Sequence, residues 1–373
     1  MSFCSFYDAS ACKSCSWIDF YYAEQLKQKG ELLHGLLDPF EPREWLKPSP
    51  SPLKGFRNKA KMVAIPSLEG VVLGLSEEAS LIQCPLYDVS MQKVLENTQK
   101  WLRDLGIKAY DVKKRKGELK YVLLTRSAHN NSMMLRFVLR SHGIIGRLQS
   151  ALSDLIALSP ELKVVTVNIQ SVHMAILEGE EEIFLTQQNR LEEHLNGIPL
   201  FIRPKSFFQT NTDVAAKLYK TAAEWLGVGN PKVIWDLFCG VGGFALHCAT
   251  ANREIIGIEI EEEAIACARD SAALIGFDNL RFEAMDTASF TAISEKNVDV
   301  VIVNPPRRGL GEQLCKWLER SSPERIIYSS CNAMSLARDL EYLGQYRVKR
   351  VQLFDMFPHT QHYETLVELD RKA

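Results

Sequence analysis

Five short apolar runs, separated by helix-like stretches, constrain the second half of the chain more than any other feature. They cover residues 232–238, 253–260, 280–286, 298–306 and 325–331. Strands that are apolar at nearly every position are typical of a parallel sheet covered by helices on both faces. Two later runs, 346–357 and 362–370, predict a closing hairpin. We therefore predict an α/β domain with a mostly parallel sheet over residues 205–373.

The first half has a different rhythm. Residues 20–39 predict a helix, residues 47–52 (KPSPSP) predict a linker, and strand-like runs with intervening helices continue to residue 204. This pattern is typical of an α+β domain with an antiparallel sheet. At 373 residues the chain is too long for one ordinary core. We predict an N-terminal region with its linker at 1–90, a central α+β domain at 91–204, and the α/β domain.

The net charge of −2 neither favours nor excludes a polyanionic partner. Residues 54–61 and 113–126 are locally basic, and Arg136 and Arg140 share a face if residues 133–140 form a strand. Such runs are either solvated surface or a track for phosphate groups. No apolar run is long enough to span a bilayer, and the N-terminus lacks a secretory pattern, so we expect a cytoplasmic protein.

Gly240, Gly242 and Gly243 lie between the first apolar run and a helix-like stretch. Glycines there either let the backbone approach a nucleotide or serve only a tight turn. Glu259 ends the next run, where a carboxylate can accept both ribose hydroxyl groups, and Asp286 ends the third, where it can contact an adenine amine. A dinucleotide dehydrogenase shares these acids. The G-x-G-G pattern and the late hairpin instead favour a Rossmann-like methyltransferase domain that binds S-adenosylmethionine (SAM).

Asn304-Pro-Pro lies at the end of the fourth run, where such sheets bind their substrates. In methyltransferases that modify exocyclic amines, an aromatic residue usually follows this motif, whereas Arg307 follows it here. An amine target is therefore disfavoured, and attention moves to Cys331 at the end of the fifth run.

A thiol and a carboxylate at strand ends of one sheet fit methyl transfer to an aromatic carbon. Uracil C5 is a poor nucleophile until a thiolate adds to C6 and turns the ring into an enolate. A base must then remove the C5 proton so that the thiol can leave. Cys331, just before a predicted helix, and Glu364 can supply these two groups. Alone, Cys331 would more often be a core residue.

Several motifs, NPPRRG, IIYSSCN, FDMFPHTQHYE, SFFQTN and WDLFCGVGGFAL, resemble those of the RNA uracil-C5 (m5U) methyltransferase family over most of the chain. The resemblance implies that Cys331 is the nucleophile and Glu364 the general base. Beside Gly240 and Asp286, it implies these SAM-site residues: Gln209, Phe238, Glu259 and Asn304. Asn304 replaces an aspartate that is frequent in the family, and Ser335 replaces a threonine; both keep hydrogen-bonding capacity.

Cys4, Cys12 and Cys15 lie in a segment too short to form its own core, and Cys84 can supply a fourth thiolate. Four thiolates suit zinc or an iron–sulfur cluster, and the Cys-Pro step at residue 84 favours [4Fe–4S]; the alternative is that no metal binds. Because the methyl transfer needs no electron, we expect a structural or RNA-docking cluster.

The cysteine set also divides the family that the chain resembles. Bacterial members acting on tRNA generally lack it, and one ribosomal-RNA branch carries it behind a β-barrel for which Cys4 leaves no room. The resemblance thus implies C5-methylation of a flipped-out uridine in 23S rRNA. We expect a monomer without an obligate protein partner, with the basic runs between residues 54 and 140 contacting RNA. The alternatives are the same reaction on tRNA and a non-catalytic RNA-binding protein with this fold.

Overall fold

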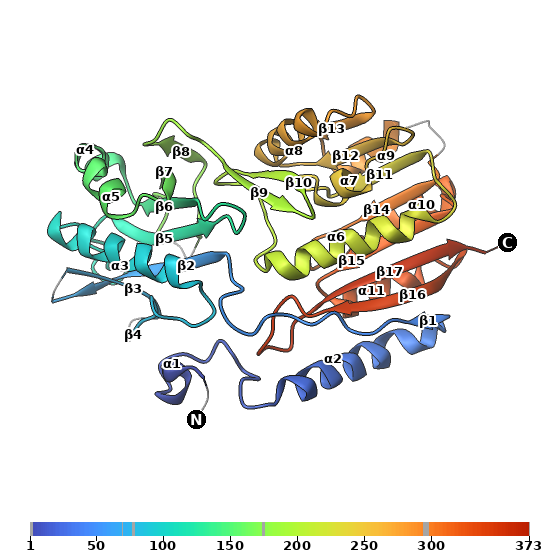
Figure 1. The fold of residues 1–373 in the computed structure, drawn as a ribbon, viewed down its shortest axis with the longest axis horizontal. Helices are drawn as coiled ribbons and strands as arrows, with labels where there is room; N and C mark the ends of the chain where they lie inside the picture. Colours follow the sequence, from blue (N-terminus) through green and yellow to red (C-terminus); the bar gives the residue numbers. More distant parts are fainter. Residues whose placement is uncertain (1–2, 69, 77–78, 174–175, 294–297, 373) are drawn as a thin grey trace. The chain divides into compact units, whose positions relative to one another are not determined.

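The computed structural model describes residues 3–68, 70–76, 79–173, 176–293 and 298–372, which form two compact units (Figure 1). Each unit is discontinuous in sequence. The seven-stranded unit contains the described residues up to Cys15 together with Leu53–Glu193. The eight-stranded unit contains Ser16–Pro52 together with the described residues from His194 onward.

The eight-stranded unit is built on a sheet with the order β1-β16-β17-β15-β14-β11-β12-β13. Its strands are β1 (Glu44–Trp45), β11 (Val233–Leu237), β12 (Glu254–Glu259), β13 (Leu280–Ala284), β14 (Val300–Val303), β15 (Arg325–Ser330), β16 (Tyr346–Phe354) and β17 (Glu364–Arg371). β17 runs antiparallel to both of its neighbours, and the other pairs are parallel. The predicted parallel sheet with a closing hairpin is confirmed.

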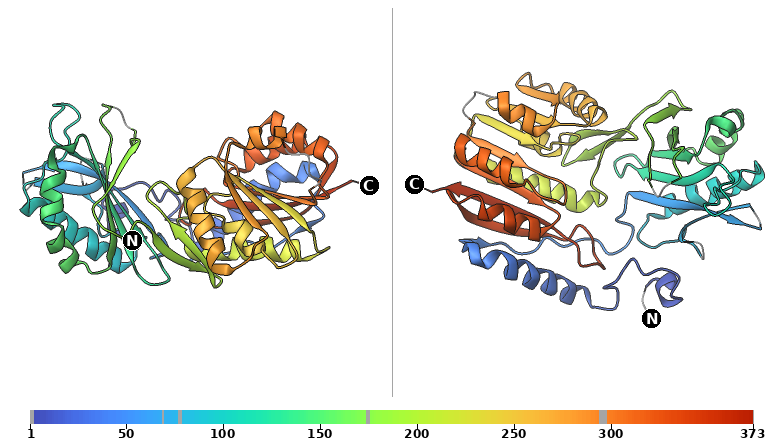
Figure 2. Two further views of the ribbon diagram at one scale, coloured as in Figure 1. Left: turned by 90° about the horizontal axis from the view of Figure 1, so that it is seen from above. Right: turned by 180° about the vertical axis from the view of Figure 1, so that it is seen from behind.

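Helices cover both faces of this sheet because its strands are apolar on both sides. Trp235 and Leu237 share a core with Leu318 and Leu336, and the alternating Ile234 belongs to the opposite face. α6 lies over one face (Figure 1), and α10 and α11 lie over the other (Figure 2). The helices of the unit are α2 (Tyr22–Leu37), η1 (Asp38–Phe40), α6 (Thr212–Gly227), α7 (Gly243–Cys248), α8 (Glu262–Ile275), α9 (Thr287–Ile293), α10 (Glu312–Ser321) and α11 (Ala333–Glu341). A separate two-stranded sheet, β9 (Leu191–Leu195) with β10 (Ile198–Ile202), precedes α6.

The Pro/Ser-rich stretch at residues 47–52, predicted to be a linker, is instead packed along the edge of this sheet. Ser49 N–H donates to the Leu353 carbonyl (2.7 Å), and Asp355 N–H donates to the Ser49 carbonyl (3.0 Å). Ser49 and Ser51 are buried. The edge strand supplies the backbone partners that composition alone does not reveal, because an unpaired edge can accept any extended segment.

The seven-stranded unit has the order β4-β3-β2-β5-β6-β7-β8. Its strands are β2 (Lys59–Ser67), β3 (Gly70–Ser76), β4 (Ala79–Ser80), β5 (Leu119–Arg126), β6 (Met133–Leu139), β7 (Leu162–Ile169) and β8 (Glu181–Phe184). Neighbours are antiparallel, as predicted, except that β6 and β7 are parallel. A parallel pair needs a crossover, which η2 (His142–Ile144), α4 (Ile145–Ser150) and α5 (Leu152–Leu158) provide. The remaining helices are α1 (Ser5–Asp8) and α3 (Val89–Asp104).

One hydrophobic core joins residues on both sides of position 90: Met62 and Leu73 share it with Leu102 and Phe137. The boundaries between the two compact units accordingly lie near residues 15, 52 and 193, whereas the predicted domain boundaries lie at residues 90 and 204. Separate roles for 1–90 and 91–204 stay a prediction. Every helix in the described part of the chain is too short or too polar to cross a membrane.

Candidate active site

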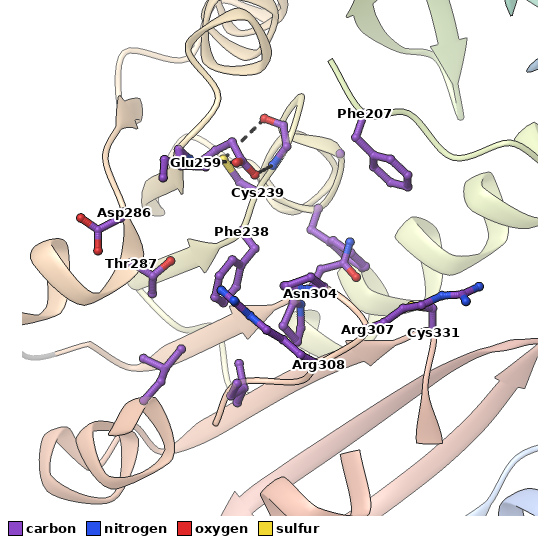
Figure 3. Close-up of a pocket in the computed structure, with 18 of the residues that line it drawn as sticks. Phe207, Phe238, Cys239, Glu259, Asp286, Thr287, Asn304, Arg307, Arg308 and Cys331 are labelled. Atoms are coloured by element: carbon purple, nitrogen blue, oxygen red, sulfur yellow. Dashed lines mark hydrogen bonds between the residues drawn. The ribbon is translucent and has the colours of Figure 1, made fainter. Parts of the chain in front are cut away.

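A cavity of about 1350 Å³ opens at the carboxyl ends of β11, β12, β14 and β15. Open α/β sheets bind their ligands at this edge. All eight residues predicted to bind SAM or to carry the catalysis line the cavity: Gln209, Phe238, Gly240, Glu259, Asp286, Asn304, Cys331 and Glu364. Figure 3 labels five of them: Phe238, Glu259, Asp286, Asn304 and Cys331. The fold thus gathers residues far apart in sequence into one site.

The turn after β11 has a backbone that few residue types adopt. Phe238, Gly240 and Gly242 have φ angles of 63°, 56° and 84°. A side chain at Gly243 would place its Cβ 2.5 Å from the Tyr219 ring, so this position needs glycine for space. A non-glycine residue in the left-handed region carries roughly 1–3 kcal/mol of strain, which is typical of ligand sites. Phe238 therefore marks the turn as a binding element.

The Glu259 carboxylate is held against this turn by backbone N–H groups. Its oxygens accept from Gly240 (3.2 Å), Ile260 (2.8 Å) and Glu261 (3.2 Å). A carboxylate has about four lone-pair directions, so two ribose hydroxyl groups would have to displace at least one of these bonds. We infer that a ligand here competes with the protein backbone for Glu259.

Asp286 is exposed and begins α9, where its carboxylate accepts hydrogen bonds from the Ser289 backbone N–H (3.0 Å) and hydroxyl group. These hydrogen bonds lower the pKa of Asp286. Figure 3 shows Asp286 and Cys331 at opposite ends of the cavity. The site therefore has room for an elongated cofactor between its acidic end and its thiol end.

Asp236 lies fully buried next to the glycine turn and accepts a hydrogen bond from Ala245 N–H (2.9 Å). Burial, and then the charge of Glu259, raise its pKa to about 8. A neutral carboxylic acid at this position adds no second negative charge beside Glu259.

Strand pairing brings Cys331 and Glu364 together. In the antiparallel register of β15 and β17, Ser330 pairs with Thr365. Cys331 follows Ser330 and Glu364 precedes Thr365, so both residues lie at the same end of this strand pair. Glu364 is 3% exposed and accepts a 2.7 Å hydrogen bond from the Ser329 hydroxyl group. Asn332 accepts a bond from Met334 N–H and begins α11 directly after the thiol.

The pKa values of both groups are shifted. Burial raises the pKa of Glu364 to about 7, although the Ser329 hydrogen bond opposes the shift. Burial and then the charge of Glu364 raise the pKa of the Cys331 thiol, whereas the charge and hydrogen bond of Arg307 lower it. A carboxyl group with a pKa near neutrality can exchange protons at physiological pH, as a general base requires.

The loop after Asn304 is fixed by α11. The Asp339 carboxylate accepts from Leu310 N–H (2.7 Å) and from the Tyr328 hydroxyl group (2.6 Å), and Asn332 donates to the Arg307 carbonyl (2.9 Å). These bonds tie the Arg307 backbone to the segment that carries Cys331. Figure 3 shows the two side chains next to each other.

Sequence reasoning missed part of the lining. Lys316, Trp317 and Arg320 line the cavity from one side of α10, and the exposed Phe207 and the half-buried Phe357 contribute two aromatic rings. The spacing of 316, 317 and 320 is that of one helix face, so this signal was present in the sequence.

The four predicted metal-binding cysteines, Cys4, Cys12, Cys15 and Cys84, line a second cavity of about 30 Å³ within the seven-stranded unit. Burial, followed by the neighbouring thiols, raises the pKa of Cys15 to about 12. In the part of the chain that the structure describes, no three His, Cys, Asp or Glu side chains are arranged as a metal-binding group. The structure thus brings the thiols to one cavity without forming a ligand set.

The basic residues predicted to contact RNA differ in their exposure. Lys113, Lys114, Arg115 and Lys116 are exposed at a turn. Arg136, by contrast, is 2% exposed and bound to Glu182 and Glu178, so its predicted surface role is wrong. The local sequence around Arg136 does not reveal that two carboxylates in or near β8 neutralise it.

Comparisons with known proteins agree with this geometry. The family model "tRNA (Uracil-5-)-methyltransferase" matches residues 21–372. The chain is 52% identical to the 23S rRNA (uracil(747)-C(5))-methyltransferase RlmC of Shewanella loihica, over 99% of both chains. It is 50% identical to the protein of the same name from Salmonella agona, over 99% of both chains.

A solved structure is also similar. The Pyrococcus abyssi tRNA (uracil-54, C5)-methyltransferase in complex with S-adenosyl-L-homocysteine matches with a TM-score of 0.80 and 27% identity, over 95% of this chain and 85% of that one. The family model and the curated relatives both cover nearly the whole chain. This chain belongs to the tRNA (uracil-5-)-methyltransferase family.

Proposed function

We propose that this protein is a SAM-dependent methyltransferase that converts a uridine of 23S rRNA to 5-methyluridine. One observation carries the proposal: the Cys331 thiol, the Glu364 carboxyl group and the glycine turn after β11 all open onto the same cavity. The RlmC relatives, whose printed name specifies uracil 747, support that nucleotide as the target.

In the proposed reaction, the Cys331 thiolate adds to C6 of the flipped-out uracil, and the resulting C5 carbanion attacks the methyl group of SAM. S-adenosylhomocysteine leaves, and C5 now carries both a methyl group and a proton. Glu364 removes that proton, the C5–C6 double bond re-forms, and the thiolate departs from C6. The adjacent Phe207 ring can stack on the extruded base, as exposed aromatic rings do in many RNA sites.

We assign the SAM site to Gln209, Phe238, Gly240, Glu259, Asp286 and Asn304. Their support is that each lines the cavity and that a related structure contains the reaction's product cofactor. For the RNA backbone we propose the exposed cations of the 113–116 turn, and separately Arg307, Arg308, Lys316 and Arg320 around the cavity.

The test uses tritiated SAM with 23S rRNA and tRNA, each transcribed without modifications. We expect label in 23S rRNA, mapped to one uridine, and none in tRNA. Label in tRNA alone would favour the second candidate, which the similar tRNA (uracil-54, C5)-methyltransferase structure supports. A 5-fluorouridine RNA separates catalysis from mere binding. Its C5 carries fluorine in place of the proton that Glu364 removes, so the thiol cannot leave and the covalent adduct persists. Binding without an adduct would show a non-catalytic protein.

We also propose that Cys4, Cys12, Cys15 and Cys84 hold a [4Fe–4S] cluster. The support is chemical: four thiols line one cavity, as iron–sulfur clusters require, although they would have to move together to bind one. A bound cluster would cross-link residues 4–15 to residue 84 and take no part in the methyl transfer. Anaerobically purified protein should be brown and contain iron, whereas colourless protein containing zinc would exclude the cluster.

We expect the enzyme to work in the cytoplasm as a monomer without an obligate protein partner. Sedimentation of the purified protein checks the oligomeric state, and a concentration-dependent dimer would contradict it.

A further inference from the structure

A buried lysine on α2 connects to the turn that carries the general base. Lys29 is fully buried, and its ammonium group donates to the Asp355 carboxylate (2.6 Å) and to the Phe357 carbonyl (3.1 Å). Lysine is rarely buried without a specific partner. Its two acceptors lie at the start of the segment between β16 and β17.

This segment, residues 355–363, leads into Glu364 and has no helix or strand of its own. Within it, Phe357 lines the active-site cavity and His359 has a φ of 66°. A turn with such a backbone needs outside contacts to keep one conformation. Glu364 begins β17 and pairs with Phe354 of β16, so the turn that joins these two residues helps to set the position of Glu364.

Contacts from residues 17–51 supply that support. Trp17 N–H donates to the His359 carbonyl (2.9 Å), and the Gln25 side chain accepts from His359 N–H (2.8 Å). The Tyr22 hydroxyl group donates to the second Asp355 oxygen (2.8 Å) and accepts from Ser51 N–H (2.7 Å). Both Asp355 oxygens are thus occupied by groups from far earlier in the sequence.

We propose that Lys29 is a positioning residue for Glu364: by binding Asp355 and the Phe357 carbonyl together, it fixes the turn that delivers the base to the cavity. An apolar side chain of similar volume could fill the space, since buried ion pairs are often no more stable than apolar packing. An apolar residue, however, could not bind the Asp355 carboxylate and the Phe357 carbonyl at the same time.

The inference rests on the proposed function, in which the two halves of the reaction need different groups. Addition of Cys331 and methyl transfer do not use Glu364, whereas release of the product does. A displaced Glu364 should therefore allow the methylated covalent intermediate to form and then slow its breakdown. A general loss of folding would lower both steps.

The experiment compares wild type, Lys29→Met, and Leu33→Ala as a matched control. Leu33 is buried on the same helix and belongs to the sheet core, so Leu33→Ala lowers stability without removing a hydrogen bond to Asp355 or Phe357. Each protein is mixed with unmodified RNA and SAM, and the SDS-resistant RNA–protein adduct and the turnover rate are measured. For Lys29→Met we expect turnover to fall by about tenfold or more and the trapped adduct to rise, while the single-turnover rate of methyl transfer stays within about threefold. Leu33→Ala should give no extra adduct.

A second variant, Lys29→Met with Asp355→Asn, separates positioning from stability. The double variant removes the buried Asp355 charge that Lys29→Met leaves without its ammonium partner. The melting temperature should therefore recover, while release of the methylated RNA stays slow. If turnover recovers together with the melting temperature, or if Lys29→Met loses turnover without accumulating adduct, Lys29 has only a structural role. Wild-type protein that neither methylates RNA nor traps 5-fluorouridine would instead refute the proposed function itself.

Discussion

Cys331 and Cys15 lie in cavities that differ in size and in neighbours. Cys331 opens onto a space of about 1350 Å³ and has Arg307 beside it, whose charge favours the thiolate. Cys15 lines a space of about 30 Å³, where the neighbouring groups that disfavour its ionisation are Cys84, Cys12 and Cys4. A thiol with Arg307 beside it and room for a ligand is suited to attack, whereas four thiols around a small cavity ionise together only with a bound cation. The surroundings, rather than the residue type, separate the two proposed roles.

The largest expected effect lies at the first cavity. Cys331→Ala should lower methylation on the order of 10⁴-fold or more and abolish the 5-fluorouridine adduct, because it removes the thiol proposed to add to C6. SAM binding, measured by calorimetry, should be unchanged. Cys267→Ala, at a buried cysteine of α8, serves as the control and should retain activity. An adduct formed by Cys331→Ala would move the nucleophile elsewhere.

At the second cavity, Cys84→Ser should lose the bound iron and lower the melting temperature, because metal binding contributes to folding free energy. Iron content and thermal unfolding measure this, with Cys267→Ala again as the control. Methylation by the remaining folded protein should persist. Unchanged iron content would show that Cys84 is not a ligand.

Glu364→Gln tests how far the buried carboxyl group lowers the free energy of unfolding as the pH rises. Its folded pKa of about 7 lies above the ordinary value, so its stabilising contribution is complete below about pH 4.5 and is lost as the pH rises through 7. The glutamine variant avoids this loss and should be more stable than wild type by about 3 kcal/mol at pH 8, with little difference at pH 4. Denaturant unfolding at both pH values provides the measurement. An equal difference at both would contradict the raised pKa.

The smallest effect concerns Arg307, the cation beside Cys331. Arg307→Met should raise the pKa of Cys331 further, slow adduct formation about tenfold at pH 7, and move the midpoint of the pH profile to a higher pH than in wild type. Arg308→Met is the matched control: it should weaken RNA binding without shifting the pH profile. The same midpoint in the pH profiles of wild type and Arg307→Met would exclude a role in thiolate stabilisation.

Strands β11, β12, β14 and β15 were predictable because each is a mostly apolar run with a helix after it. The pairing of β1 with β16 was not, since Glu44 and Trp45 carry no strand pattern and their partners lie about 300 residues away. The parallel pairing of β6 and β7 was missed for a similar reason: local sequence does not specify strand direction. Long-range pairing is decided by packing rather than by propensity.

The predicted site residues converge on one cavity because motifs at the ends of parallel strands meet at one edge. Buried charges were harder to foresee. Arg136 and Lys29 look like surface residues in the sequence, and their partners, Glu182 and Asp355, lie 46 and 326 positions away. A charged side chain in an isolated sequence is rightly expected in water, so only the fold reveals such pairs.

The pairing of α2 and β1 with the last strands of the sheet has a consequence during synthesis. Residues 17–52 leave the ribosome early, yet β16, the turn at 355–363 and β17 are made last. Until then Lys29 lacks Asp355 as a partner, and α2 must wait while some 300 residues follow. The general base and its support are therefore completed together, at the end of translation, so a nascent or prematurely ended chain would carry the Cys331 thiol before it could release a product.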